Sequence, residues 1–432
     1  MSEQVVQADL TWLDGAFRPN VEVCIAADGR IAAVGAAERY PTQPLRRRAL
    51  LPGFVSAHSH AFQRGLRGRG ETFPAGAGSF WSWREAMYEL VGRLDVDAFR
   101  ALTLQAFREM RAAGITAVGE FHYLHHTAAD VEDYAFDELV LEAAREAGIR
   151  LVLLETYYRT GGIGRPLAGA QQRFGTPSPE RFWRQLDKLV GMADPTTQTV
   201  GVALHSVRAV PREELSGLYA EARRRGLPVH MHLEEQRQEI EECREAYGRS
   251  PFDLLRETID LAEGFTAVHC THTSPADLAS LLAAGGNVCL CPLTEANLGD
   301  GLPVLPETPP PAQLCLGTDS NVRISMFEVM RWLEYGQRLR REGRGALRDE
   351  RGAVAPVLLD AATRGGARAL GLPTGAIAPG LWADFVAIDL DTPALAGWEP
   401  ETLLESLVFG AGEEAIAATC VGGRWQERPV AR

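Results

Sequence analysis

Leu51-Pro52-Gly53-Phe54-Val55-Ser56-Ala57-His58-Ser59-His60 is an apolar run that ends in two histidines separated by one residue. Side chains i and i+2 of an extended backbone lie on the same face, so His58 and His60 point in one direction from the end of a buried strand. Two imidazoles placed in this way form a chelating pair for a metal ion. Because the same spacing is frequent in proteins that bind no metal, the pair needs support from the rest of the chain.

This run is the first of eight segments that have the pattern of buried strands. They cover residues 49–58, 116–122, 150–157, 199–205, 228–232, 265–269, 287–292 and 313–319. Several are rich in Val, Leu or Ile without alternation, which favours a parallel sheet covered on both faces. Helical patterns at residues 97–113, 136–148, 180–192, 213–226 and 275–284 lie between them. The sequence therefore predicts an α/β fold, a (β/α)8 TIM-like barrel, with polar residues at the C-terminal ends of its strands.

The two ends of the chain have short strand-and-turn patterns in place of this alternation. Residues 21–34 contain the turn Asp28-Gly29, and residues 383–389 precede a second hairpin pattern at 415–425 with Gly422-Gly423. We expect residues 1–51 and 373–432 to form one small β-sandwich domain. Residues 52–372 would then form the metal-dependent barrel.

Composition limits the location and the partners of the chain. A net charge of −13 disfavours nucleic acid, whose binding depends on neutralising phosphates. No apolar run is long enough to cross a bilayer and no export signal is visible, so we expect a cytoplasmic protein without a membrane partner. Seven scattered cysteines suit the core of a protein in a reducing compartment. Lys188, the single lysine, lies in an amphipathic pattern, which argues against a metal pair bridged by a carboxylated lysine.

Further metal ligands are found at the ends of other predicted strands. All ten histidines lie between His58 and His272. His232 ends the fifth strand and Asp319 ends the eighth, and together with the first pair they predict a nitrogen-rich site for one metal ion, with a position open to water. Zn²⁺ is the natural occupant, and Fe²⁺ or Mn²⁺ also fits such ligands. Glu235 follows His232 where the chain turns, and its neighbour Glu234 is expected to be a solvated turn residue.

Four motifs in combination resemble the amidohydrolase superfamily in its single-metal deaminase branch. They are residues 52–60, His232-x-x-Glu235, His269-Cys270-Thr271-His272 and Gly317-Thr318-Asp319-Ser320. The similarity covers essentially the whole chain, including the divided β domain. Residues 58–64, 205–208 and 331–339 further resemble the formimidoylglutamate deiminase family. That resemblance implies hydrolytic deimination of N-formimidoyl-L-glutamate to N-formyl-L-glutamate and ammonia in histidine degradation, by attack of metal-bound hydroxide on the formimidoyl carbon.

The resemblance also implies a role for each residue of the site. One metal ion would be held by His58, His60, His232 and Asp319. Asp319 would take a proton from the attacking water, and Glu235 would pass a proton to the departing nitrogen. His269 would stabilise the tetrahedral intermediate by a hydrogen bond, whereas His272 is expected to be structural.

A small-molecule dicarboxylate substrate is expected to be read by arginines. Arg208, which closely follows a strand end, and Arg84, which is implied by the resemblance, would bind the carboxylates, because the planar guanidinium matches a carboxylate bidentately. The hydroxyl of Tyr123 would donate a hydrogen bond, and Gln63 and His205 would complete the pocket. The loop arginines Arg64, Arg67 and Arg69 are expected in solvent.

Two positions depart from the family pattern and two other functions stay open. Asn321 stands where the family has histidine and Glu234 where it has a small residue, which bears on the choice of substrate. Arg323 is a further candidate for a carboxylate contact. The alternative enzyme is a deaminase of a guanine-like nucleobase or nucleoside with the same single-metal site, and the alternative outside catalysis is an oligomeric scaffold. A homodimer is implied by the resemblance alone.

Overall fold

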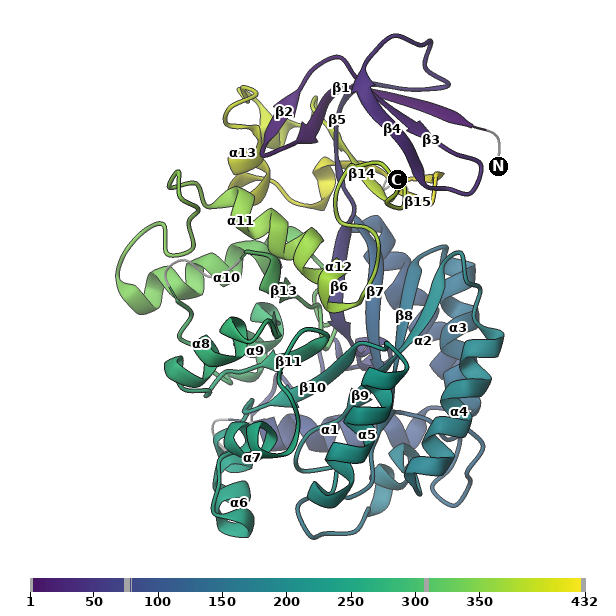
Figure 1. The fold of residues 1–432 in the computed structure, drawn as a ribbon, viewed down its shortest axis with the longest axis vertical. Helices are drawn as coiled ribbons and strands as arrows, with labels where there is room; N and C mark the ends of the chain where they lie inside the picture. The colour runs from purple at the N-terminus through teal and green to yellow at the C-terminus, as the bar shows by residue number, and fades with distance from the viewer. Residues whose placement is uncertain (1–2, 74–77, 79, 307–310, 429–432) are drawn as a thin grey trace.

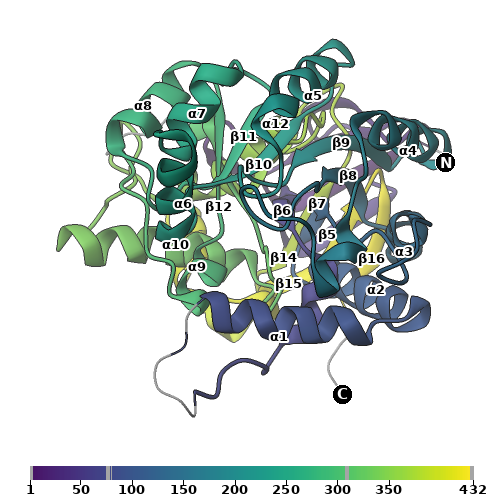
Figure 2. The same cartoon turned by 90° about the horizontal axis from the view of Figure 1, so that it is seen from below.

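The computed structural model describes residues 3–73, 78, 80–306 and 311–428. Its largest unit is a barrel of eight parallel strands that pair in chain order (Figures 1 and 2). The strands are β6 (Phe54–Ser59), β7 (Ile115–His122), β8 (Arg150–Tyr157), β9 (Gln198–Leu204), β10 (Val229–Leu233), β11 (Phe265–His269), β12 (Asn287–Leu290) and β13 (Leu314–Leu316). A parallel bridge between Ser59 and Asp319 brings the end of β6 beside the chain that follows β13. The predicted barrel is confirmed.

Most helices surround the barrel and connect its strands, and the last four follow its final strand. They are α1 (Phe80–Arg93), α2 (Val96–Ala112), α3 (Ala135–Ala147), α4 (Pro179–Met192), α5 (Arg212–Arg224), α6 (Arg237–Tyr247), α7 (Pro251–Thr258), α8 (Pro275–Ala283), α9 (Pro292–Leu298), α10 (Met326–Arg341), α11 (Ala355–Asp360), α12 (Gly366–Ala369) and α13 (Leu403–Gly410). Three of them begin with a serine N-cap followed by proline, at Ser178, Ser250 and Ser274. The serine hydroxyl accepts a backbone N–H bond there, and proline fits the first helical position because its missing N–H is not needed.

The predicted strand at residues 49–58 is in fact two strands of two different sheets. β5 (Gln43–Pro52) belongs to the β domain and β6 to the barrel, with Gly53 between them. A Cβ atom at Gly53 would lie 2.1 Å from Oγ1 of Thr116 on β7, so glycine is the residue that fits at this junction. A continuous apolar run cannot reveal this division, because both strands are buried.

The β domain is built from both ends of the chain, as predicted (Figure 1). Its sheet combines β1 (Gln4–Leu13), β2 (Ala16–Arg18), β3 (Val21–Ile25), β4 (Ile31–Ala36) and β5 with β14 (Phe385–Asp389), β15 (Ile416–Val421) and β16 (Arg424–Glu427). β3 and β4 pair with each other but lie far from β15 in this sheet, yet Val23, Ile31 and Cys420 share one hydrophobic cluster. The sheet therefore folds over its own core, as a sandwich does.

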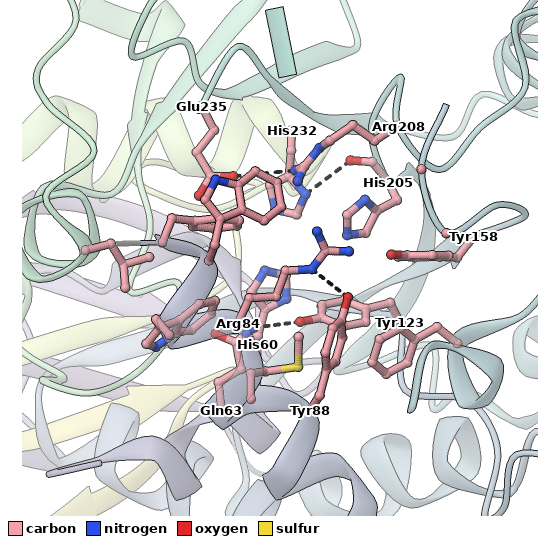
Figure 3. A pocket seen from close by; sticks show the side chains of 18 of the residues that line it. His60, Gln63, Arg84, Tyr88, Tyr123, Tyr158, His205, Arg208, His232 and Glu235 are labelled. Carbon is pink, nitrogen blue, oxygen red and sulfur yellow. Dashed lines mark hydrogen bonds and ion pairs between the residues drawn. The ribbon is translucent and has the colours of Figure 1, made fainter. Parts of the chain in front are cut away.

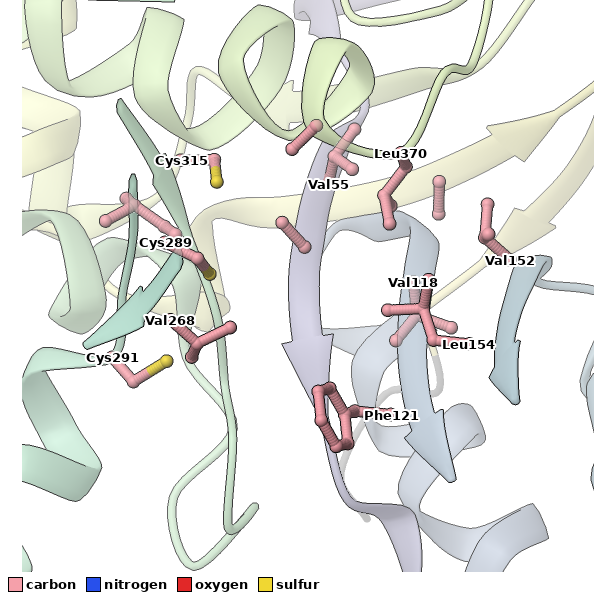
Figure 4. Close-up of a cluster of buried hydrophobic side chains, with 14 of the residues drawn as sticks. Val55, Val118, Phe121, Val152, Leu154, Val268, Cys289, Cys291, Cys315 and Leu370 are labelled. Atoms are coloured by element: carbon pink, nitrogen blue, oxygen red, sulfur yellow. The ribbon is translucent and has the colours of Figure 1, made fainter. Parts of the chain in front are cut away.

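Apolar side chains fill the inside of the barrel. Val55, Val118, Cys289 and Leu370 are among them, and Figure 4 shows them between the strands. All seven cysteines are buried and free, which confirms that they are core residues. Among the described residues, no helix combines the length and the apolar character needed to pass through a bilayer.

One buried ion pair joins the barrel to the β domain. Arg150, the first residue of β8, donates from Nε and Nη2 to the two carboxylate oxygens of Asp384 over 2.8 and 3.0 Å. Asp384 also accepts hydrogen bonds from the Thr374 hydroxyl and the Gly422 amide. Both partners of the ion pair are almost fully buried. The two charges therefore neutralise each other, and neutral donors further stabilise the carboxylate of Asp384.

Candidate metal and substrate site

Three histidines converge at the C-terminal ends of the barrel strands. His58 lies on β6, His60 directly follows that strand, and His232 lies on β10, and all three are buried. Their nitrogens lie within metal-binding reach of one another. Oδ1 of Asp319 is 3.4 Å from Nε2 of His58 and of His60. The structure thus brings together the four residues predicted to hold a metal ion.

Hydrogen bonds from Nδ1 fix the orientation of two of these imidazole rings. Nδ1 of His60 donates to the carbonyl of Phe121 over 2.7 Å, and Nδ1 of His232 donates to the carbonyl of His205 over 3.1 Å. Each ring therefore turns a bare Nε2 lone pair toward the centre, as metal-binding histidines do. Nε2 of His232 is 3.2 Å from Nε2 of His58, so the two nitrogens are close enough to bind one cation. The donor set fits a divalent metal.

Electrostatics favour the ligand forms of these groups. Burial lowers the pKa of His60 to about 3, so its imidazole is neutral. Burial opposes ionisation of Asp319, but the imidazoles of His58, His269 and His60 hold its pKa below the usual range. Neutral imidazole and ionised carboxylate are the forms that coordinate metals.

Several site residues have left-handed backbone. The φ angle is 50° at Glu234, 72° at His269 and 49° at Asp319. Such angles are unfavourable for residues other than glycine and gather at functional sites, where the surrounding structure imposes them. At Asp319 the conformation is held from both sides, because its amide donates to the His58 carbonyl and its own carbonyl accepts from the His60 amide.

His269 and Glu235 lie beside the metal cluster. Nε2 of His269 is 3.7 Å from Oε1 of Glu235 and 3.8 Å from Oδ2 of Asp319, and its Nδ1 is 3.3 Å from Oε1 of Glu295. Burial alone would lower the pKa of His269, but these three carboxylates together raise it to about 10. Burial also raises the pKa of Glu235, against the opposing charges of His269 and Arg208. This corner of the site therefore holds groups that can carry protons near neutral pH.

A cavity of about 750 Å³ opens next to the cluster (Figure 3). All five predicted substrate-binding residues line it, and so do Glu235, His269 and Asp319. The five are Gln63, Arg84, Tyr123, His205 and Arg208.

The two arginines enter this cavity from different elements. Arg208 comes from the segment after β9 and is 9% exposed, whereas Arg84 lies on α1 and donates from Nε to the Tyr88 hydroxyl over 2.5 Å. Figure 3 shows both side chains reaching toward the same space.

Neutral polar groups complete the wall. Nε2 of Gln63 donates to the Tyr123 hydroxyl over 2.7 Å, which leaves the hydroxyl proton of Tyr123 free to donate. Burial, reinforced by the charge of Arg208, holds the pKa of His205 well below its usual value, so this ring is neutral. Its ring packs against Tyr158 at a centroid distance of 4.4 Å.

Sequence reasoning missed the aromatic part of the pocket and one buried acid. Phe80, Trp81, Trp83, Tyr88, Tyr158 and Phe174 all line the cavity. Four of them belong to α1, and no local pattern tells where a helix that follows a loop will pack. Glu239 on α6 is completely buried behind Arg208. Its charge and its place on a polar helix gave no signal of burial.

Three expectations about charged residues were wrong. Glu234 is buried, because its carboxylate accepts the Phe252 amide at the start of α7. Arg64 is also buried and pairs with Glu109 at 2.7 Å. Arg323 does not line the cavity and is paired with two acids away from it.

Asn321, which we expected to bear on the choice of substrate, does not line the cavity. Its side-chain amide donates to the Ser59 hydroxyl and to the Asp319 carbonyl, both over 3.0 Å. Ser59 in turn donates to Glu120 over 2.6 Å. Asn321 therefore supports the backbone of Asp319, and its role is structural in this arrangement.

Comparisons with known proteins agree with this architecture. The model of the amidohydrolase family matches residues 49–426. Formimidoylglutamate deiminase of Pseudomonas aeruginosa is 39% identical over 98% of this chain and 94% of its own length. The crystal structure of an amidohydrolase from Brucella melitensis superposes with a TM-score of 0.87 at 32% identity, covering 98% of this chain and 94% of that one. A 5-methylthioadenosine/S-adenosylhomocysteine deaminase of Natronomonas pharaonis is 28% identical over 87% of this chain and 80% of its own length.

Proposed function

The chain belongs to the amidohydrolase family, and we propose that it hydrolyses N-formimidoyl-L-glutamate to N-formyl-L-glutamate and ammonia, a step of histidine degradation. The observation that carries the proposal is that a metal-binding cluster and two arginines, Arg84 and Arg208, share one cavity. The cluster suits hydrolysis of a C–N bond, and the arginines suit the two carboxylates of the substrate. The identity to a formimidoylglutamate deiminase adds independent support.

We assign a single Zn²⁺ to His58, His60, His232 and Asp319, with Fe²⁺ or Mn²⁺ as substitutes. When bound, the metal supplies a Lewis acid that lowers the pKa of a water molecule toward neutrality. The protein's part is to keep the three imidazoles neutral and aimed inward. The carbonyls of Phe121 and His205 do this for two of the three, by accepting the Nδ1 protons of His60 and His232.

Proton transfer falls to three neighbouring side chains. Ionised Asp319 accepts the first proton of the attacking water. His269, whose pKa the neighbouring carboxylates raise, donates from Nε2 to the oxygen on which charge develops. Glu235, whose pKa burial raises, delivers a proton to the formimidoyl nitrogen. The hydroxyl proton of the tetrahedral intermediate then passes through Glu235 to the same nitrogen as the C–N bond breaks, so ammonia leaves and the formyl carbonyl forms. The proton held by Asp319 returns to Glu235. The 3.7 Å between His269 and Glu235 allows both to face one reacting carbon.

Substrate selection follows from charge. Arg208 and Arg84 each offer a guanidinium fork to a carboxylate, and Tyr123 offers a hydroxyl proton beside them. The aromatic side chains of α1 and of Tyr158 exclude water around these contacts. A hydrogen bond to a charged group contributes about 1.5–3 kcal/mol, so each arginine is worth at least about tenfold in affinity.

A purine deaminase is the second candidate, because the aromatic lining of the cavity suits a stacked base. A neutral purine would leave the buried guanidinium of Arg208 without an anionic partner from the substrate, which is unfavourable. This cost favours the dicarboxylate.

Ammonia release tests the proposal. Metal-loaded protein is assayed with N-formimidoyl-L-glutamate and, separately, with guanine and adenosine. We expect turnover of the first substrate alone, and Arg208→Ala to lower its kcat/KM by about 100-fold, while the exposed Arg344→Ala has no effect. Turnover of a purine that Arg208→Ala leaves intact would favour the second candidate.

We further propose a cytoplasmic homodimer. Seven free buried cysteines suit a reducing compartment, and the exposed Trp332 and Leu339 of α10 offer apolar surface that a second copy would bury. Light scattering after size-exclusion chromatography gives the mass directly, and a monomer would contradict the dimer.

A further inference from the structure

Arg208 lies between two carboxylates. Its Nη2 is 3.7 Å from Oε2 of Glu235, and its Nε is 3.7 Å from Oε1 of Glu239. Both distances are too long for a hydrogen bond, and the buried Nε has no hydrogen-bond partner among the described residues. The guanidinium is therefore attracted from two sides without being locked to either acid.

The two acids differ in their relation to the cavity. Glu235 lines it beside the metal cluster, whereas Glu239 does not line it and has no exposed surface. Glu239 lies at the start of α6, behind Arg208 as seen from the cavity. It can therefore act on the substrate only through Arg208.

Apart from Arg208, the described residues offer Glu239 little that would stabilise a negative charge on its carboxylate. Neither of its carboxylate oxygens makes a hydrogen bond of normal geometry to a described residue. A fully buried carboxylate in this state is costly to keep, and an apolar side chain of similar size would stabilise α6 better. Within the described chain, Arg208 is the cation found at ion-pair distance from it. The next acid on that face, Glu242, pairs with Arg165 instead.

We propose that Glu239 is a positioning residue that holds the guanidinium of Arg208 away from Glu235 and ready for a substrate carboxylate. This inference rests on the proposed function, because it assigns a carboxylate of the substrate to Arg208. Without the charge of Glu239, the attraction of Glu235 is unopposed and Arg208 closes onto it. The resulting ion pair occupies the donors that the substrate needs. It also keeps Glu235 ionised, although the reaction needs a proton from it.

This arrangement predicts a specific kinetic signature for Glu239→Gln, which keeps the shape of the side chain and removes its charge. At pH 8 Glu239 of the wild-type protein is ionised, because this pH lies above its raised pKa of about 7. In the variant at this pH and at low substrate concentration, Arg208 is drawn to Glu235, so KM for N-formimidoyl-L-glutamate rises by about tenfold or more. At saturation the substrate carboxylate recovers Arg208, so kcat falls by much less than KM rises. Glu239→Asp retains a charge and restores most of the lost affinity.

A double-mutant cycle separates positioning from a general structural role. In an Arg208→Ala background, Glu239→Gln has nothing left to position, and KM stays at the value of Arg208→Ala alone. Glu241→Gln, an exposed change on the same helix, is the matched control and leaves KM unchanged. Melting temperatures verify that each variant is folded.

The outcomes separate this inference from the proposed function. Absence of ammonia release by the metal-loaded wild-type protein overturns both. An active wild-type protein with an unchanged KM in Glu239→Gln overturns the inference alone. Equal effects of Glu239→Gln with and without Arg208, or no recovery in a folded Glu239→Asp variant, also overturn it, because they indicate a structural role.

Discussion

Arg150, at the end of the barrel that carries the β domain, and Arg208, at the end that carries the cavity, are both buried but differently paired. Arg150 makes a bidentate ion pair with Asp384, whose oxygens also accept two neutral donors. Arg208 has two acids at 3.7 Å and an Nε without a hydrogen bond. The first arrangement is complete within the protein. The second is completed, in our account, by the substrate.

The two arginines show that a buried charge can contribute either to folding stability or to substrate affinity. A satisfied buried pair is destabilised strongly when one partner is removed, because the other charge is left alone. A buried cation without a full set of partners costs stability in the free protein and returns it as affinity. The cluster of His58, His60 and His232 follows the second pattern, since these three buried imidazoles gather donor atoms that a bound cation would complete.

The largest effect is expected at this cluster. His232→Ala removes one of the four expected ligands. Bound metal, measured by elemental analysis, and kcat/KM should fall together, the latter by at least about 1000-fold. A variant that loses activity while it retains one equivalent of metal would contradict the assignment of His232 as a ligand.

Arg150→Ala should show the opposite behaviour. It leaves Asp384 buried and unpaired, so the free energy of unfolding should fall by about 3–5 kcal/mol. KM should stay unchanged as long as the protein is folded, because the pair is remote from the cavity. Denaturant titration gives the first quantity, and Arg344→Ala serves as the exposed control. If Arg150→Ala lowered substrate affinity but not stability, the proposed difference between Arg150 and Arg208 would be contradicted.

A smaller effect concerns the pH dependence of stability. Burial raises the pKa of Glu239 from its ordinary 4.5 to about 7, although Arg208 opposes the rise. The folded protein therefore holds this proton up to about pH 7, whereas the unfolded chain releases it near pH 4.5. The stability that Glu239 contributes is present below pH 4.5 and is lost as pH rises to about 7.

Denaturant titrations of the wild-type protein and Glu239→Gln measure this contribution as a difference. The stability of the wild-type protein relative to the variant should decrease by about 1–3 kcal/mol between pH 4.5 and pH 8. A difference that is constant over this range would mean that Glu239 is ionised throughout, as a fully paired acid would be.

Much of the barrel and of the metal cluster was predictable because the relevant signals are local. A buried parallel strand is a short apolar run, and the ends of such strands meet at one edge of the barrel, so residues like His232 and Asp319 are brought together by topology alone. The assignment of Arg84 needed the family resemblance, since nothing in the pattern of α1 links it to the strand ends.

Burial of charged side chains was not predictable, because it depends on partners that are distant in the sequence. Arg64 is buried by Glu109 on α2, and Glu234 by the amide of Phe252 at the start of α7. Glu239 is buried against Arg208, which belongs to the segment after another strand. In each case the charged residue lies in a loop or on a polar helix, and its neighbours in the sequence are as polar as those of an exposed residue. Only the assembled barrel supplies the opposite charge or the free amide.

The central claim is that the incompletely paired arginines of the cavity are kept for the carboxylates of the substrate. Its most direct test compares kcat/KM for N-formimidoyl-L-glutamate and for the γ-amide, N-formimidoyl-L-glutamine, with the same metal-loaded protein. The account predicts that the amide is poorer by about 10-fold to 100-fold, since it leaves one guanidinium without an anion. Equal kcat/KM values for the two compounds would contradict it.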